Sequence, residues 1–479
     1  MVMVIKAELV FIPMPRMGHF LSMVQVAKLL VDLNPHLSIT FLILNLIPDA
    51  KLHAYLHSLT GTSTARIKFL NLAQPETDKH VNRADFIRVL VNTHGPLVKE
   101  AVTGIVHCSR SAPDSPRLAG FVLDMFLTPL IDLGNEFDVP SYVFYTSGAA
   151  FLGFQLYTLA LHEEQNVNIP ELKDSDAEFN VPSYLNPVSS KLFPTVMLKS
   201  ESISMVMNVA RGLREAKGIM VNTFWELEPH ALASLSEGKV PPVYPVGPLL
   251  NLESAGEVHQ CCDIMEWLDE QTPSSVVFLC FGSGGSFSRD QVKEIACALE
   301  QSAHRFLWSL RQPPDPSEGP MASPTDYDDV SEVLPKGFLE RTAGMGKIIG
   351  WAPQVAILGH PAIGGFVSHC GWNSTLESIW FGVPMAAWPL YAEQQLNALE
   401  VVRELGLAVE IKMDYRKDEE GIVEAERIEK GIKGVMEQDS EVRRRVKEMK
   451  EKSRKALKEG GSSHSMLGGF IANVMDRNY

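Results

Sequence analysis

The 479-residue sequence has few cysteines, a deficit of positive charge and no long apolar run, and each shortage excludes a class of protein. Six cysteines without a C-x-x-C pair argue against a disulfide framework and favour a reducing compartment. Lys and Arg number 43 against 58 Asp and Glu, which gives a formal net charge of −15. A chain this acidic is not expected to bind nucleic acid or an anionic membrane through its overall field.

The apolar stretches near the N-terminus are too short for targeting or membrane insertion. Ala7–Pro13 falls short of the hydrophobic segment of a signal peptide and is interrupted by proline. Ile39–Ile47 is well below the ~20 residues that span a bilayer. We therefore expect a cytoplasmic protein with no integral membrane segment.

Short apolar segments alternate with segments of helical periodicity, which predicts an α/β protein with parallel sheets covered by helices on both faces. In the first half, strands are expected at Glu8–Pro13, Ser38–Asn45, Ile67–Leu72, Leu118–Leu123, Tyr142–Tyr145 and Gly218–Asn222, and helices at Phe20–Leu33 and Asp85–Val106. In the second half, strands are expected at Ser275–Phe281, Arg305–Leu310, Lys347–Ile349 and Gly365–Ser368, and a helix at Asp290–Ser302.

A stretch rich in proline and glycine, Pro241–Glu257, separates the two halves and marks a linker. The predicted organisation is two doubly wound domains, residues 1–245 and 263–458, joined by residues 246–262 and followed by a C-terminal segment, 459–479. Gln312–Glu332 is expected to be a solvated loop, and Glu424–Lys458 a charged surface helix.

The most informative segment follows the expected strand Gly365–Ser368. His369–Trp372 forms a turn with a glycine, and a helix is expected to open at Asn373. A helix N-terminus directly after a strand and a tight turn is an anion site suited to a pyrophosphate, because its N–H groups and positive dipole end point at the ligand. Ser374-x-x-Glu377 is also a capping box, which many helices use for stability alone.

Trp351–Gln394 resembles, across 44 positions, the plant secondary-product signature of family 1 UDP-glycosyltransferases. Shared features continue in Pro13–His19, Phe281–Ser283 and Gly460–Ser463, so the resemblance spans essentially the whole chain. It implies the GT-B architecture, in which two Rossmann-like domains face each other across a cleft. The acceptor would lie mainly on the first domain and the donor on the second, with the C-terminal helix packing back on the first.

The resemblance also implies roles for donor-binding residues that suit their chemistry. Trp351 would stack on the uracil ring, and the backbone of Ala352 would bond its edge. Gln354 would lie beside the ribose, and Glu377 would accept hydrogen bonds from the ribose hydroxyls. The remaining donor contacts would be Ser283, His369, Asn373 and Ser374 at the diphosphate, and Thr146, Trp372, Tyr391, Glu393 and Gln394 at the sugar. Gln394 at the end of the signature resembles glucose-preferring members, so UDP-glucose is the expected co-substrate.

His19 follows the first expected strand at the start of a helix, whose positive end disfavours the imidazolium and keeps the ring neutral. Taken alone, such a histidine is more often a structural hydrogen-bonding residue. In the resembling family it is the general base, and Asp124 matches the acid that orients it; without that match, Asp114, Asp132 and Asp138 are alternatives. The implied reaction is a single displacement that inverts the anomeric configuration.

The acceptor pocket is predicted to be apolar, with Phe20, Phe126, Phe151 and Met205 as candidate wall residues and core packing as their alternative role. Ser22 stands where many relatives carry proline three residues after the histidine. This pattern is similar to that of a subgroup acting on flavonoids, other phenolics and terpenoids. We expect a monomer that binds a UDP-sugar and a small apolar hydroxylated acceptor.

Two D-x-D motifs, Asp174-x-Asp176 and Asp326-x-Asp328, lie in polar stretches and are interpreted as solvated loops rather than metal ligands. His53 and His57 have helical spacing but lack the glutamate of a zinc-protease motif, so neither a metal nor another cofactor is expected. The fragment Gly282-x-Gly284 leaves a dinucleotide-dependent oxidoreductase as the second hypothesis. A catalytically inactive sugar-nucleotide sensor is the third, and the presence of both His19 and Asp124 argues against it.

Overall fold

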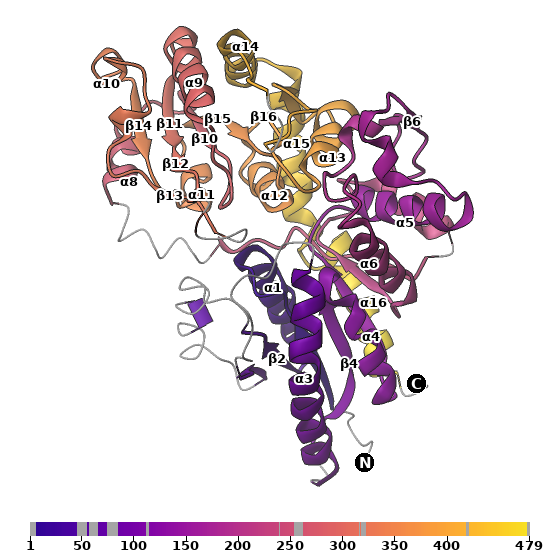
Figure 1. The fold of residues 1–479 in the computed structure, drawn as a ribbon. Helices are drawn as coiled ribbons and strands as arrows, with labels where there is room; N and C mark the ends of the chain where they lie inside the picture. Colours follow the sequence, from indigo (N-terminus) through magenta and orange to yellow (C-terminus); the bar gives the residue numbers. More distant parts are fainter. Residues whose placement is uncertain are drawn as a thin grey trace. The chain divides into compact units, whose positions relative to one another are not determined.

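A computed structural model describes residues 6–45, 55–56, 66–73, 85–111, 115–238, 240–252, 262–315, 317, 322–417 and 421–476. His53, His57, Asp114 and residues 253–261 of the expected linker region lie outside these residues. The chain divides into two compact units (Figure 1). The first comprises Met1–Ile169, Lys199–Leu250 and Lys455–Tyr479, and the second comprises Pro170–Leu198 and Asn251–Arg454.

The first unit is built on a parallel sheet in the order β3-β2-β1-β4-β5-β8-β9. Its central strands are mostly apolar: β1 is buried along its whole length and β4 from Ala119 to Asp124, as expected for a sheet covered on both faces. The strands are β1 (Ala7–Ile12), β2 (Leu37–Ile43), β3 (Ile67–Asn71), β4 (Arg117–Asp124), β5 (Ser141–Tyr145), β8 (Ile219–Val221) and β9 (Val243–Pro245).

The helices of the first unit include one from the very end of the chain. Helix α16 (Ser462–Met475) inserts Phe470 between Tyr142 and Tyr244, with ring centroids 4.9 and 5.5 Å away. Arg117 donates to the carbonyl oxygen of Val474 at 2.8 Å. In Figure 1, α16 lies among the elements of the first unit. The others are α1 (Met17–Leu33), α3 (Phe86–Ser111), α4 (Ile131–Glu136), α5 (Ala149–Glu164), α6 (Ile203–Glu215), α7 (Pro229–Glu237) and the 3-10 helix η1 (Met125–Leu130).

The second unit repeats this plan with a parallel sheet in the order β14-β11-β10-β15-β16-β17. Alternate residues of β10 enter two different apolar clusters, one with α9 and α14 and the other with α8, α11 and α13. The strands are β10 (Val276–Cys280), β11 (Arg305–Ser309), β14 (Gly346–Ile349), β15 (Ile363–Ser368), β16 (Met385–Ala387) and β17 (Ala408–Glu410). The helices include α8 (Cys262–Asp269), α9 (Arg289–Ser302), α10 (Phe338–Arg341), α11 (Gln354–Leu358), α12 (Trp372–Phe381), α13 (Gln394–Leu399) and α14 (Ala425–Met436).

One segment departs from the sequence-based boundaries. Pro170–Leu198 falls inside the expected domain 1–245, yet it belongs to the second unit. The buried guanidinium of Arg416 donates at 2.7 Å to Thr195 Oγ1 and to the carbonyl oxygens of Lys191 and Phe193. Most of the acceptors are backbone oxygens more than 200 residues away in the sequence, so no local pattern in the segment predicts these bonds.

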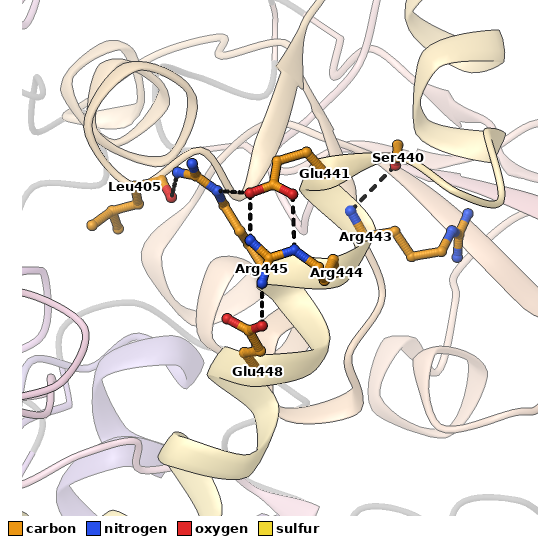
Figure 2. Close-up of polar contacts among 7 residues, drawn as sticks. All are labelled: Leu405, Ser440, Glu441, Arg443, Arg444, Arg445 and Glu448. Carbon is orange, nitrogen blue, oxygen red and sulfur yellow. Dashed lines mark hydrogen bonds and ion pairs between the residues drawn. The ribbon is translucent and has the colours of Figure 1, made fainter.

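The charged segment Glu424–Lys458 forms two helices rather than one, α14 and α15 (Glu441–Ala456). Ser440 Oγ accepts from the backbone N–H of Arg443 at the start of α15, and Glu441 binds both Arg444 and Arg445 (Figure 2). The hydrogen bonds from Arg444 and then Arg445 lower the pKa of Glu441 to about 2. An acidic residue in the first helical turn and arginines one turn later fit the i,i+3 and i,i+4 pairing that supports exposed helices.

Each sheet has one point at which the strand order reverses direction, which is called its switch point. In the first unit this point lies between β1 and β4, and in the second between β10 and β15. Ligands of open α/β sheets bind outside the carboxyl ends of the strands at such points. Among the described residues, no helix combines the length and apolar character needed to cross a membrane.

Candidate active site

In the first unit, His19 and Asp124 meet at the switch point. His19 is the third residue of α1, directly after β1, and Asp124 is the last residue of β4. Because β1 and β4 are adjacent and parallel, their carboxyl ends lie together, and His19 Nδ1 is 2.7 Å from Asp124 Oδ2. The other carboxylate oxygen, Oδ1, accepts the N–H of Phe126 at 3.0 Å, which fixes the orientation of the acid.

The exposures of the two side chains suit a base and its orienting acid. Asp124 is fully buried, whereas the His19 side chain is 24% exposed. Thr146 follows β5, and its Oγ1 lies 3.3 Å from His19 Nδ1. The ring of Phe126 is 5.5 Å from the imidazole, so the histidine has an apolar neighbour beside its polar partners. The alternative acids Asp132 and Asp138 lie in α4 and beyond its end, whereas Asp124 is the acid that bonds the ring.

The four predicted acceptor-pocket residues are placed differently. Phe20 is 1% exposed and packs against Phe41 and Phe69 in the core of the first unit, so it is a core residue rather than a wall residue of a pocket. Phe151, at 6% exposure, stacks on Phe154 in α5 and is likewise mostly buried. Phe126 lies beside His19, and Met205 is a half-buried residue of α6. Phe126 is therefore the one of the four that the structure brings to the candidate base.

In the second unit, the switch point is lined by two glycines and a neutral histidine rather than by charged side chains. Gly282 follows β10 with φ +72°, and His369 follows β15. A Cβ at Gly282 or Gly371 would lie 2.6 or 2.5 Å from His369 Nε2, so the buried imidazole fills a space that only glycine leaves open. Desolvation lowers the pKa of His369 to about 4. The ring is therefore neutral at neutral pH, and its buried Nδ1 has no hydrogen-bond partner among the described residues.

Helix α12 begins at Trp372, one residue earlier than expected, and its N-cap is Gly371 without a side-chain cap. The capping-box alternative is therefore wrong, because Ser374 lies inside the first turn. Gln354 Nε2 instead donates to Ser374 Oγ at 2.8 Å and to Glu377 Oε2 at 2.6 Å. Loss of solvation raises the pKa of the half-buried Glu377 to about 7. The first turn of α12 thus presents N–H groups that have no intrahelical acceptor.

A cation supports the tryptophan of this site, which the sequence did not indicate. Trp351 is 41% exposed, and the guanidinium carbon of Arg311 lies 5.2 Å from its ring centroid. Arg311 Nε is held 2.9 Å from Asp326 Oδ1. The side chain of Asp326 occupies the space that a Cβ at Gly350 would need, next to Trp351. The buried Ala352 follows the indole and anchors the segment in an apolar cluster.

This arrangement corrects the interpretation of Gln312–Glu332 as only a solvated loop. Arg311–Gln312 (β12) and Thr325–Asp326 (β13) form an antiparallel pair that carries the Arg311–Asp326 contact. In the other D-x-D motif, Asp176 pairs with Lys191. The described part of the chain contains no group of three or more His, Cys, Asp and Glu side chains placed to hold a metal ion.

At the end of the signature, the Gln394 side chain binds the backbone of the turn that precedes it. Its Oε1 accepts the N–H groups of Leu390 and Tyr391 at 2.9 and 3.0 Å, so its NH₂ is the end of the amide able to donate to another group. Glu393 Oε1 is 3.4 Å from the side-chain nitrogen of Asn397. Trp372 is buried at the start of α12.

The Gly282-x-Gly284 fragment does not continue as a dinucleotide fingerprint. Phe287 stands at its final glycine position, and its ring packs on Phe281 and Trp388 with centroids 4.6 and 5.0 Å away. Ser283 is exposed in the turn after β10, and Lys417 Nζ donates to Ser286 Oγ at 2.7 Å in the same loop. The loop is thus a short glycine turn that closes on an aromatic cluster.

Two Rossmann-like units, one with a histidine–aspartate pair and the other with a glycine turn and an open helix N-terminus at the switch point, compose a glycosyltransferase of the GT-B class. A family profile described as "UDP-glucoronosyl and UDP-glucosyl transferase" matches residues 213–438. The chain is 55% identical to UDP-glycosyltransferase 71A15 of Malus domestica, over 98% of this chain and 99% of the relative. It is also 55% identical to UDP-glucose flavonoid 3-O-glucosyltransferase 6 of Fragaria ananassa, over 98% of both chains.

Solved structures agree with these relatives. A transferase from Siraitia grosvenorii in complex with UDP matches with a TM-score of 0.89 and 46% identity, covering 98% of this chain and 100% of that one. UGT71G1 of Medicago truncatula, complexed with UDP-glucose, matches with a TM-score of 0.84 and 39% identity over 98% and 99% of the chains. The chain belongs to the plant family 1 UDP-glycosyltransferases. It is an enzyme that transfers a sugar from a UDP donor to small plant metabolites, and this replaces the oxidoreductase hypothesis.

Proposed function

We propose that this enzyme transfers glucose from UDP-glucose to a hydroxyl of a small apolar plant metabolite, with inversion at the anomeric carbon. The acceptor class is a flavonoid, another phenolic or a terpenoid. Relatives named as flavonoid and anthocyanidin 3-O-glucosyltransferases, at 53–55% identity over nearly the full length, support the flavonoid class first. UDP-glucose in the complex of a structural relative supports the donor.

The observation that carries the mechanism is the 2.7 Å contact between His19 Nδ1 and Asp124 Oδ2. With Nδ1–H donated to the buried carboxylate, the lone pair of Nε2 takes the proton of the acceptor hydroxyl. The acceptor oxygen then bonds to the anomeric carbon as the bond to the diphosphate breaks on the opposite side. An α-linked donor therefore yields a β-glucoside, and the proton of the acceptor hydroxyl is then bound to His19.

The second unit supplies the donor contacts in this proposal. The neutral His369, Ser283 and the first-turn N–H groups of α12 at Asn373 and Ser374 hold the diphosphate and stabilise the charge that it gains. Trp351, Ala352, Gln354 and Glu377 hold the uridine, and Trp372, Tyr391, Glu393 and Gln394 hold the sugar, together with Thr146 of the first unit. Acceptor binding is assigned to residues 1–245 and donor binding to residues 263–458.

An acceptor-panel assay with UDP-glucose and mass-spectrometric detection tests this function directly. The expected result is a mass increase of one hexose on flavonoid or other phenolic acceptors and the β configuration in the purified product. A panel in which UDP-galactose or another sugar donor is used far better than UDP-glucose would contradict the glucose assignment. Product with the α configuration would contradict inversion.

Metal independence and oligomeric state are parts of the same proposal. We expect activity to persist after exhaustive treatment with EDTA and a single monomeric species by light scattering. Loss of activity that Mg²⁺ or Mn²⁺ restores would assign a metal role, with Asp326 and Asp328 as the first residues to substitute. A dimer at assay concentration would contradict the monomer.

A further inference from the structure

A buried carboxylate in the first unit caps a helix that starts next to the candidate base. Glu228, in the loop between β8 and α7, is 2% exposed. Its Oε2 accepts the N–H of Ala149 at 3.0 Å, and its Oε1 accepts the N–H of Ala150 at 2.7 Å. Ala149 and Ala150 are the first two residues of α5, whose N-cap, Gly148, has no side chain to supply a cap. Glu228 therefore provides from a distant element the cap that the local sequence lacks.

Three residues connect this capped helix end to β5, and the first of them contacts His19. The chain leaves β5 at Tyr145 and passes through Thr146, Ser147 and Gly148 into α5. Thr146 Oγ1 lies 3.3 Å from His19 Nδ1, the nitrogen that Asp124 also contacts. A shift of the first turn of α5 would therefore move a side chain that touches the imidazole.

The charge of Glu228 has a second consequence for the imidazole. His19 lies in the first turn of α1, where the positive helix end already disfavours the imidazolium. The N-terminus of α5 is a second positive helix end near the same ring, and a carboxylate bound to two of its N–H groups offsets it. A carboxylate at this helix end favours the protonated imidazole that forms when His19 takes up a proton.

Other charged groups lie on the surrounding elements. Asp124 on β4 bonds His19 itself, and the guanidinium of Arg16, before α1, lies 6.0 Å from the ring of Phe86. His230 on α7 is exposed. Glu163 is at the opposite end of α5, where Arg211 and Arg214 of α6 bind it.

We propose that Glu228 is a positioning residue for glycosyl transfer, which holds the segment from Thr146 to Ala150 against His19 and preserves the basicity of its ring. The inference rests on the proposed role of His19 as the base. It assigns to Glu228 no contact with donor or acceptor. Its loss should therefore lower turnover and change the pH profile while leaving UDP binding intact.

The same loop offers a matched control. Glu226 lies two residues earlier, and its Oε2 accepts from Ser462 Oγ at 2.8 Å, at the start of α16. Glu226→Gln removes the same charge from the same loop, but its bond goes to the terminal helix rather than to α5. A general effect of weakening this loop would appear in both variants.

The experiment compares Glu228→Gln, Glu228→Asp and Glu226→Gln with the parent enzyme by steady-state kinetics from pH 5 to 9, UDP titration calorimetry and thermal unfolding. For Glu228→Gln we expect kcat to fall about 10- to 100-fold and the UDP dissociation constant to stay within about twofold. The acidic limb of the kcat/KM profile should move to lower pH by about half a unit, because imidazolium loses a neighbouring negative charge. Glu226→Gln should stay within about twofold of the parent throughout.

Glu228→Asp separates position from charge, and it also decides the outcome if Glu228→Gln does not fold. Aspartate keeps the charge but is one methylene shorter, so kcat should fall while the acidic limb stays in place. The proposal is overturned if Glu228→Gln and Glu226→Gln lose the same fraction of kcat with unmoved profiles, or if Glu228→Asp matches the parent in kcat. His19→Ala is measured in parallel: turnover that survives it refutes the base assignment, whatever Glu228 does.

Discussion

The two switch points of this enzyme share one topology and solve opposite problems. At the β1–β4 point, a histidine is already bonded to a buried aspartate and to a threonine. At the β10–β15 point, a buried neutral histidine has Nδ1 without a partner among the described residues, and α12 starts without a side-chain cap. The first place is complete in itself, whereas the second has unused hydrogen-bonding capacity that a ligand can satisfy.

This difference follows from what each place is proposed to do. A base needs one fixed tautomer and orientation in every turnover, so its partners are permanent and buried. A nucleotide site must bind and release its ligand, so its donors are left for the ligand, and a polar group that stays unpaired in a protein interior costs about 1–3 kcal/mol. Substitutions at the first point should therefore change turnover, and substitutions at the second should change donor affinity.

The largest expected effect is that of His19→Ala at the first point. Without the base, kcat should fall about 10³-fold or more, because general-base catalysis contributes typically 10²–10⁴-fold. Titration calorimetry should give a UDP dissociation constant within about twofold of the parent. His36→Ala, an exposed histidine before β2, serves as the control. A comparable loss of UDP affinity in His19→Ala would break the division of labour between the two points.

Next in size is Glu377→Gln at the second point. The ribose hydroxyls should lose bonds to a charged acceptor, each worth about 1.5–3 kcal/mol, so UDP binding should weaken about 10- to 100-fold. Turnover at saturating UDP-glucose should change little, because the glutamine amide preserves the size of the side chain beside Gln354. An effect confined to the KM of the acceptor would contradict the assignment.

A smaller effect should appear in the pH dependence of donor binding. The pKa of Glu377 is raised to about 7, and hydroxyl donors of the ribose favour the ionised form. Ligand binding therefore lowers this pKa and releases a proton, so affinity is full above pH 7 and is lost as the pH falls below it. UDP-glucose, whose diphosphate does not titrate here, should bind up to about tenfold more weakly at pH 6 than at pH 8. Glu377→Gln should abolish the dependence, and a dependence that persists would assign it elsewhere.

The smallest effect is expected from Arg311→Met. Removing the cation beside Trp351 should weaken UDP binding about three- to tenfold, since such contacts contribute about 0.5–2 kcal/mol. Arg305→Met, at the exposed start of β11, is the control. Tighter UDP binding in Arg311→Met would mean that Arg311 covers the ring face that the uracil needs.

The local sequence was sufficient for the strands on either side of both switch points, whereas the short strands β9, β16 and β17 were not expected. Asp124 was preferred to its alternatives only through the resemblance to a family. His19, Asp124 and His369 all stand within a few residues of a strand end, where the alternation of apolar segments places them. The same local patterns left a capping box at Ser374 as an alternative, which is wrong because S-x-x-E is a cap only if the helix starts at the serine, and this helix starts at Trp372. Phe20 was expected in a pocket because it is next to His19 in the sequence. Successive helix residues point in different directions, however, and the Phe20 side chain points into the core.

The sequence by itself therefore determined the fold class and the positions of the candidate base and of the candidate nucleotide-binding turn, since strand periodicity, glycine and helix starts are local properties of the chain. Only the tertiary structure decided which distant groups complete those places. Examples are Arg311 and Asp326 beside Trp351, and Glu228 on α5. Such contacts join side chains to rings, backbone N–H groups or carbonyls on other elements, and every residue has that backbone, so nothing in the sequence marks the partner until the packing brings it near.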